Sequence, residues 1–333
     1  MSENNGAVRF IDLFSGVGGF RFAAEQTFEK YGVPAECVFS SDIDSYARKA
    51  YFANFGDYPN GDITQIHAND VPDHDVLFAG FPCQPFSILG NGKGFDDIRG
   101  TLFFDIARIL AAKRPKAFIL ENVKRLIGHN QGQTLKKILY VLRDELGYTV
   151  YYKVLNALDY GLPQKRERVI LVGFDQPLDY QFPPKRPTFT PLSAILETDV
   201  NRKHYASERI RKKRWKDHTP TVTPSIWHEN KAGHISSYPY SCALRAQASY
   251  NYLLVNGERR LTPREMLRLQ GFPDAFKIVV SESQTRKQAG NAVPVNIIQA
   301  VFEACLPVLL DNLNSVASSK SKISSRARPS SLR

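Results

Sequence analysis

The chain has 333 residues and a mass of 37.6 kDa, which is long enough for one large domain or two ordinary ones. With 43% hydrophobic and 23% charged residues, its composition excludes a wholly disordered chain, a collagen-like fibre and a small disulfide-bonded protein. Residues 1–180 carry 20 basic and 22 acidic side chains, so the net charge of +11 arises entirely from residues 181–333. Such an excess fits either a solvated surface or a phosphate-rich partner such as nucleic acid.

No apolar run approaches 18 residues, and the N-terminus lacks a charged-then-apolar signal, so we expect neither a membrane span nor a secretory signal. The four cysteines are Cys37, Cys83, Cys242 and Cys305, and their spacing fits neither a zinc site nor a disulfide framework. These features predict a cytoplasmic protein without a bound metal.

The first half of the chain alternates short apolar runs with segments of helical spacing. This alternation predicts an α/β fold with a Rossmann-like, doubly wound and mostly parallel sheet. Gly147 is placed to end the last of these helices. The expected strands are 8–14, 37–40, 75–80, 117–120, 148–155 and 169–173, and the expected helices are 20–31, 44–55, 101–113 and 134–146.

The pattern changes after a boundary segment, 175–191, that contains five prolines. Beyond it the chain is irregular and basic to about residue 280, with short strand-like pieces such as 252–255. Helical spacing returns at 296–310, and the serine-rich, basic tail is predicted to be disordered. The expected units are a large domain of residues 1–187 completed by 286–314, a smaller irregular domain of residues 188–285, and a tail of residues 315–333.

The segment 12–20, DLFSGVGGF, places Gly16, Gly18 and Gly19 in the turn after the first strand. Such a turn presents backbone N–H groups and a helix N-terminus to a ligand. Asp42, at the end of the next strand, suits the two hydroxyls of a ribose. The turn alone predicts an adenosine-containing cofactor, although dinucleotide-binding turns and structural bends share the pattern.

Cys83 follows an apolar strand in the segment GFPCQPFS, 80–87, between two prolines. A lone cysteine is often an inert buried residue. Here the fixed turn and the glycine-rich stretch after it indicate a nucleophile beside a mobile loop.

Three further motifs carry charge or turn signals at the ends of predicted elements. Glu121, in ENV, is placed to hold a proton at neutral pH if it is partly desolvated, or to act as a helix cap or salt-bridge partner. Arg166 and Arg168, in QKRER, face one side of a strand unless the run is simply solvated. The segment QAGNAVPV, 288–295, is a turn that opens the last helix.

Together these motifs resemble the DNA (cytosine-5) methyltransferases of bacterial restriction–modification systems. The order and spacing of DLFSGVGGF, GFPCQPFS, ENV, QKRER and QAGNAVPV are those of the family, and RLTPREMLRLQGFPDAF at 260–276 adds its penultimate motif. The resemblance covers about residues 1–180 and 258–310. The stretch between is where the family holds its target-recognition domain, so residues 188–285 are expected to read DNA.

The resemblance implies that S-adenosylmethionine binds at the carboxyl edge of the sheet. The chain departs from the family pattern at Asp42, where Glu is common, at Ile43, where an aromatic residue is common, and at Ala292, where Ser is frequent. The residues that the motifs assign to the cofactor are Phe14, Gly16, Gly18, Gly19, Asp42, Ile43, Asp62, Ile63, Pro82, Leu102, Asn291 and Val293.

It also implies catalytic roles for four residues. Cys83 would add to C6 of a cytosine flipped out of double-stranded DNA, and Glu121 would hydrogen-bond the ring at N3 and the exocyclic amine. Arg168 would hold the O2 carbonyl, and Arg166 would support the site or the Cys83 loop. Lys93 and Arg99 are candidates for phosphate contacts. A functional pairing with a restriction endonuclease, without a stable complex, and a monomeric state are expected.

Three alternatives stay open at this point. A transfer-RNA cytosine-5 methyltransferase of the same family shares the motifs, but its Cys-Phe-Thr string is absent. An inactive DNA-binding homologue is disfavoured by the presence of Cys83, Glu121 and Arg168. A nicotinamide oxidoreductase would explain only the glycine-rich turn.

Overall fold

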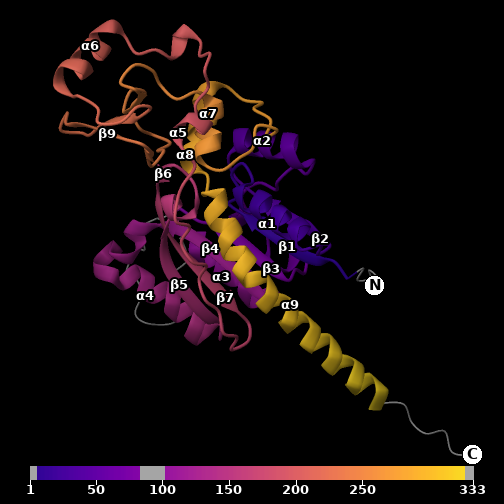
Figure 1. Cartoon of the computed structure of the whole chain (residues 1–333). Coiled ribbons are helices and arrows are strands. Elements are labelled where there is room, and N and C mark those ends of the chain that lie inside the picture. The colour runs from indigo at the N-terminus through magenta and orange to yellow at the C-terminus, as the bar shows by residue number, and fades with distance from the viewer. Residues whose placement is uncertain (1–5, 83–101, 327–333) are drawn as a thin grey trace, which may run out of the picture.

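The computed structural model describes residues 6–82 and 102–326, with side chains to residue 313. Its centre is a six-stranded sheet in the order β2-β1-β3-β4-β7-β5 (Figure 1). The first four strands in this order are parallel, and β7 is antiparallel to both of its neighbours, which confirms the predicted mostly parallel α/β fold. The strands are β1 (Val8–Leu13), β2 (Ala35–Ser41), β3 (Val76–Gly80), β4 (Ala117–Val123), β5 (Thr149–Asn156) and β7 (Glu167–Phe174).

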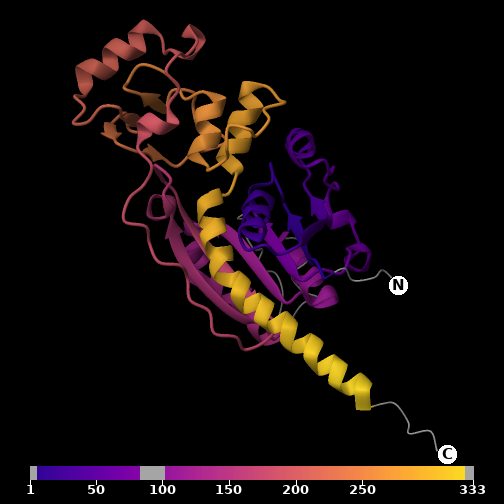
Figure 2. The ribbon, with the colours of Figure 1, turned by 45° about the vertical axis from the view of Figure 1, so that its right-hand side comes forward.

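Helices cover both faces of this sheet, as Figure 2 shows for α9 on one of them. Successive side chains of a strand point to opposite faces, so each strand contributes to two cores. In β1, Phe10 packs in the core beneath α1 and α9, whereas Ile11 packs in the core beneath α3 and α4. The helices of this part are α1 (Gly19–Lys30), α2 (Ser45–Phe55), α3 (Leu102–Lys113), α4 (Gln133–Tyr140) and α9 (Val295–Arg326).

The predicted elements differ from the structure mainly at their ends. Strand β4 runs three residues beyond the expected 117–120, so Glu121 lies within the strand. The helix expected over 134–146 is α4 followed by a π-helical turn, Val141–Glu145. Gly147 then adopts a left-handed φ of 70°, as expected for a residue that ends a helix.

The chain between β7 and α9 builds a second, smaller arrangement beyond one end of the large sheet (Figures 1 and 2). It contains short strands, as predicted, and they form an antiparallel sheet in the order β11-β8-β9. It also contains helices, which the sequence analysis did not predict for this irregular stretch. A two-residue parallel pairing of β6 with β10 joins it to the part that contains the large sheet. Strand β6 (Gln164–Lys165) comes just before β7 in the chain. The elements between β7 and α9 are α5 (Leu192–Ile195), α6 (Glu208–Asp217), α7 (Pro263–Leu269), α8 (Glu282–Asn291), β8 (Ile226–Glu229), β9 (Ile235–Tyr238), β10 (Ser241–Cys242) and β11 (Leu253–Val255).

Helix α9 extends well past its predicted end at residue 310, and reaches Arg326. The first part of the expected tail, 315–326, is therefore helical rather than irregular, because it continues a helix that is anchored on the sheet. Val301, Phe302 and Cys305 are fully buried there. The stretch Glu282–Leu313 is long and apolar enough to cross a membrane, but 56% of its apolar window is buried inside the protein. Packing on the sheet accounts for its apolar composition.

Candidate active site

A cavity of about 680 Å³ opens at the carboxyl edge of the parallel strands. Residues that end or follow β1, β2, β3 and β4 form one wall, and the end of α8 forms another. All five motifs singled out in the sequence contribute residues to the lining of this cavity. Parallel strands end together at such an edge, which is where open α/β sheets bind ligands.

The glycine-rich turn and Asp42 are fastened to each other. The backbone N–H of Gly16 donates to Asp42 Oδ2 at 2.7 Å, and the N–H of Asp44 donates to Oδ1 at 2.7 Å. Burial raises the pKa of Asp42, while these two backbone donors oppose the rise. Gly16 has a φ of +55° and nothing within 4 Å of the position where a Cβ would stand, so its bare backbone faces the cavity.

Glu121 and Arg168 form an ion pair in the cavity wall. Arg168 Nε lies 2.6 Å from Glu121 Oε1, and the two side chains are only 12% and 10% exposed. The antiparallel register of β4 and β7 pairs Val123 with Arg168, which puts Glu121 diagonally opposite. Next to them, Asn122 donates to the carbonyl of Phe81 at 2.8 Å. This bond fixes the chain two residues before Cys83.

Arg166 lies beside this pair but is used differently. Its side chain is 1% exposed and donates to the carbonyls of Leu244 at 2.8 Å, Gly290 at 3.0 Å and Ala292 at 2.7 Å. Burial lowers the pKa of Arg166 to about 9, helped by the nearby charge of Arg168. Arg166 thus lines the cavity, and its guanidinium also connects its own segment to Leu244 and to the end of α8.

The family model for the C-5 cytosine-specific DNA methylase matches residues 8–307. The chain belongs to this family. It is a DNA (cytosine-5-)-methyltransferase, as the resemblance in the sequence predicted.

Bacterial relatives match the methylase over most of its length. The Type II methyltransferase M.NgoBI of Neisseria gonorrhoeae is 57% identical over 89% of this chain and 92% of its own. The Type II methyltransferase M.HaeII of Haemophilus aegyptius is 56% identical over 87% and 90%. Among solved structures, the Entamoeba histolytica methyltransferase EhMeth matches with a TM-score of 0.70 at 19% identity, over 92% of this chain and 99% of its own. The last likeness shows the fold alone.

Most of the residues that the motifs assign to the cofactor line the cavity of the methylase. Asn291 reaches it from α8, on the side opposite the strands. The assigned residues that line the cavity are Phe14, Gly16, Asp42, Ile43, Asp62, Ile63, Pro82, Leu102 and Asn291.

Gly18, Gly19 and Val293 are not among the lining residues that the structure describes. They pack behind the wall. A Cβ on Gly19 would stand 2.7 Å from Val293 Cγ2, and one on Gly18 would stand 2.2 Å from the ring of Phe55. These two glycines are needed because neighbouring side chains fill the space that a side chain of their own would take.

Cys83, Lys93 and Arg99 lie outside the described residues, 6–82 and 102–326. Pro82 is the last residue described before them and lies in the cavity wall. Within the described part, no group of three His, Cys, Asp or Glu side chains is placed to hold a metal ion.

The basic run RKKRW, 211–215, lies on α6, and some of its side chains stabilise the fold through contacts with carboxylates. Arg214 is 1% exposed and pairs with Glu229 at 2.9 Å. Arg211 pairs with Glu258 at 2.8 Å, and Trp215 Nε1 donates to the same carboxylate at 2.7 Å. Arg211 and Arg214 are therefore held by carboxylates of the protein itself.

Sequence reasoning missed the roles of Asn122, Gln164 and Gln270. All three side chains are buried and hydrogen-bonded, and Asn122 lines the cavity. Each lies in or next to a quoted motif, so the signal for their importance was present. Their partners are between 19 and 106 residues away, and local patterns do not reveal such contacts.

Proposed function

We propose that the enzyme transfers a methyl group from S-adenosylmethionine to C5 of a flipped cytosine in a specific sequence of duplex DNA. The observation that carries this proposal is the cavity at the carboxyl edge, which joins the Gly16–Asp42 turn to the Glu121–Arg168 pair. One end suits an adenosine-containing cofactor, and the other suits a polar heterocycle.

The residues present fit S-adenosylmethionine. Gly16 leaves open the space beside its backbone that a Cβ would otherwise fill. Asp42 and Asp62 supply carboxylates for hydroxyl or ammonium groups, and Phe14, Ile43 and Leu102 supply apolar surface. When bound, S-adenosylmethionine supplies an electrophilic methyl group.

Glu121 and Arg168 bind the cytosine ring in this proposal. Glu121 hydrogen-bonds N3 and the exocyclic amine, and Arg168 donates to the O2 carbonyl. Their mutual contact at 2.6 Å orients both groups before the base arrives. Preorganised donors of this kind stabilise the charge that develops on the ring during addition.

Cys83 is the proposed nucleophile. Its thiolate forms a bond to C6, and the electron pair displaced from the C5–C6 double bond makes C5 nucleophilic. C5 would then take the methyl group, and the broken sulfur–methyl bond would leave its electron pair on the sulfur as a thioether. A base then removes the C5 proton, and the electron pair of that C–H bond re-forms the C5–C6 double bond as the Cys83 thiolate leaves C6 with the pair of the C–S bond. Because the ring is out of reach within a duplex, the nucleotide is flipped out.

We assign sequence recognition to the smaller domain, residues 188–285, and chemistry to residues 1–187 completed by 286–314. The charge distribution supports this division, since the basic excess lies entirely after residue 180. The relatives are named Type II methyltransferases. With the resemblance found in the sequence, we infer a cytoplasmic, monomeric enzyme that works in parallel with a restriction endonuclease without forming a stable complex.

The test is methyl transfer from isotopically labelled S-adenosylmethionine to duplex DNA, with transfer RNA as a parallel substrate. Methylated cytosines are then located by sequencing DNA from cells that express the chain. Label in duplex DNA at one recurrent sequence supports the proposal. Label in transfer RNA alone, or in neither polymer, contradicts it.

A further inference from the structure

Two side chains next to the active-site cavity hold both backbone groups of Leu244. The N–H of Leu244 donates to Gln164 Oε1 at 2.9 Å, and its carbonyl accepts from Arg166 Nη1 at 2.8 Å. Gln164 is 0% exposed and Arg166 is 1% exposed. These bonds extend the short parallel pairing of β6 with β10, which ends at Cys242. The segment that follows β10 is thereby fixed to residues 164–166, which lead into β7.

Gln164 also reaches the helix on its other side. Its Nε2 donates to the carbonyl of Leu269 at 2.8 Å and to Gln270 Oε1 at 3.3 Å. Gln270, itself 0% exposed, donates in turn to the carbonyl of Ala289 in α8. The amide of Gln164 therefore links Leu244 to α7 and, through Gln270, to α8.

Arg166 completes the link to the cavity. Its Nη2 donates to the carbonyls of Gly290 and Ala292, and Gly290 lines the cavity. A Cβ on Gly290 would stand 2.3 Å from the backbone nitrogen of Ala246. The segment 244–246 and the end of α8 are thus in close backbone contact, with no room for a side chain between them.

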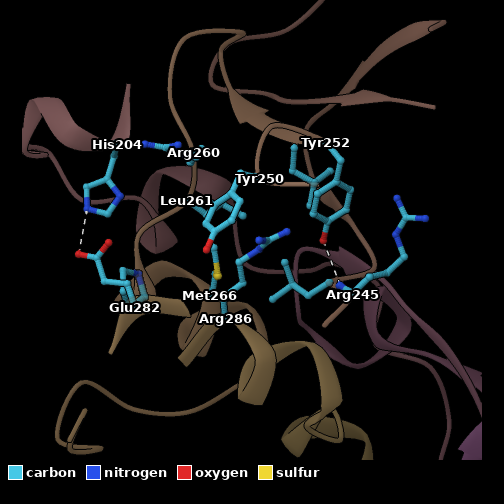
Figure 3. A pocket seen from close by; sticks show the side chains of 12 residues that line it. His204, Arg245, Tyr250, Tyr252, Arg260, Leu261, Met266, Glu282 and Arg286 are labelled. Atoms are coloured by element: carbon cyan, nitrogen blue, oxygen red, sulfur yellow. Dashed lines mark hydrogen bonds and ion pairs between the residues drawn. The ribbon is translucent and has the colours of Figure 1, made fainter. Parts of the chain in front are cut away.

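Arg245 lies directly after the residue that these side chains hold. Its backbone N–H donates to the Tyr252 hydroxyl at 3.0 Å, as Figure 3 shows, and its guanidinium lies 4.7 Å from the centre of the Tyr252 ring. Arg245 is exposed and has no carboxylate partner among the described residues. An arginine in this state is free to meet a base edge or a phosphate.

We propose that Gln164 and Arg166 are positioning residues that fix the register between the segment 244–246 and the catalytic cavity. In this way they couple base-pair discrimination to methyl transfer. Arg245 can meet its base pair while a flipped cytosine lies in the cavity only if the distance between the segment 244–246 and the cavity is fixed. This inference rests on the proposed function. A buried polar network whose groups are paired specifies one arrangement, and its partial loss permits several. A misplacement of about 1 Å at a reacting centre can cost on the order of 10²-fold in rate.

The test is Gln164→Leu, which keeps the volume but leaves Leu244 N–H and the Leu269 carbonyl without this partner. The quantity measured is kcat/KM on the duplex methylated in cells, divided by kcat/KM on duplexes with one base pair changed. We expect this ratio to fall at least about tenfold, while the dissociation constant of S-adenosylmethionine stays within about twofold. Gln133→Leu, at an exposed position at the start of α4, is the matched control and should keep the wild-type ratio.

A purely structural role would lower the melting temperature and the fraction of active enzyme, but would leave the discrimination ratio unchanged. Arg166→Lys provides a second test, because one ammonium group cannot reproduce the fork that reaches three carbonyls. A wild-type discrimination ratio in every variant that folds overturns the inference. If both Gln164→Leu and Arg166→Lys are insoluble, Gly290→Ala replaces them, because its added methyl group would push against the backbone of Ala246. A wild-type discrimination ratio in Gly290→Ala would then overturn the inference. Failure of the wild-type enzyme to methylate any duplex overturns the proposed function instead.

Discussion

The carboxylate of Glu121 and the guanidinium of Arg168 meet at 2.6 Å across two antiparallel strands in the cavity wall. Each side chain is about one-tenth exposed, so water competes weakly for the contact. Two oppositely charged groups that hold each other in this way keep a fixed geometry before any ligand enters. The pair therefore presents an acceptor and a set of donors side by side, which is the requirement for binding one edge of a pyrimidine.

We expect Glu121→Gln to lower kcat by roughly 10²-fold or more, the usual scale for a positioned acid. Glutamine keeps the shape but removes the negative charge that pairs with Arg168. The dissociation constant of S-adenosylmethionine should stay nearly unchanged, because the proposed contact of Glu121 is with the base. Single-turnover methylation and cofactor titration measure the two quantities. A normal turnover with greatly weakened cofactor binding would assign Glu121 to the wrong ligand.

Gly19→Ala tests the packing behind the cavity. The added methyl group would stand 2.7 Å from Val293 Cγ2, so we expect a loss of about 1–3 kcal/mol in the free energy of unfolding. Val293→Ala should relieve the overlap, and the double variant should be more stable than Gly19→Ala alone. Urea denaturation of the four proteins completes the cycle. An additive double variant would show that the two residues do not compete for space.

Asp12→Asn tests a buried carboxyl at the base of the glycine-rich turn. Burial raises the pKa of Asp12 from 3.8 to about 8, against the attraction of Arg21 and with the repulsion of Asp42. Between about pH 4 and pH 8 the unfolded chain loses this proton while the folded chain keeps it. The wild-type free energy of unfolding should therefore fall as pH rises through this window, by at most about 1.4 kcal/mol per pH unit.

The neutral asparagine cannot ionise, so it removes this contribution. The variant should gain stability relative to the wild type on going from pH 5 to pH 8, as measured by urea denaturation at several pH values. A difference between the two proteins that is constant with pH would show that Asp12 does not titrate in this range.

The sequence predicted the sheet, its flanking helices and most of the cavity wall, because apolar periodicity and strand-end motifs are local signals. The burial of Arg214 was not predicted, since a basic run has the same pattern whether a carboxylate covers it or water does. The place of Gly19 behind the wall was missed for a related reason. Its neighbour Val293 is distant in the chain, and only the folded structure shows that they touch.

The last prediction concerns helix α6, whose exposed cations lie on one face. Arg209, Lys212, Lys213 and Lys216 are spaced by three and four residues and are exposed, whereas Arg214 is buried. Lys212 is 78% exposed, and its one carboxylate partner among the described residues is Glu208, one turn earlier, a pair that contributes at most about 0.5 kcal/mol. This stripe has the character of a phosphate-binding surface.

Lys212→Ala combined with Lys216→Ala should therefore weaken binding to all duplexes alike and reduce the salt dependence of binding by about one or two units of slope. The free energy of unfolding should stay within about 0.5 kcal/mol of wild type, as for exposed positions generally. Arg214→Met is the contrasting variant. It leaves Glu229 without its buried partner, so it should lower stability by about 1–3 kcal/mol without a matching change in salt slope. DNA titrations between low and physiological salt, beside urea denaturation, measure both. An unchanged slope after loss of the two lysines would place the DNA on another face of the domain.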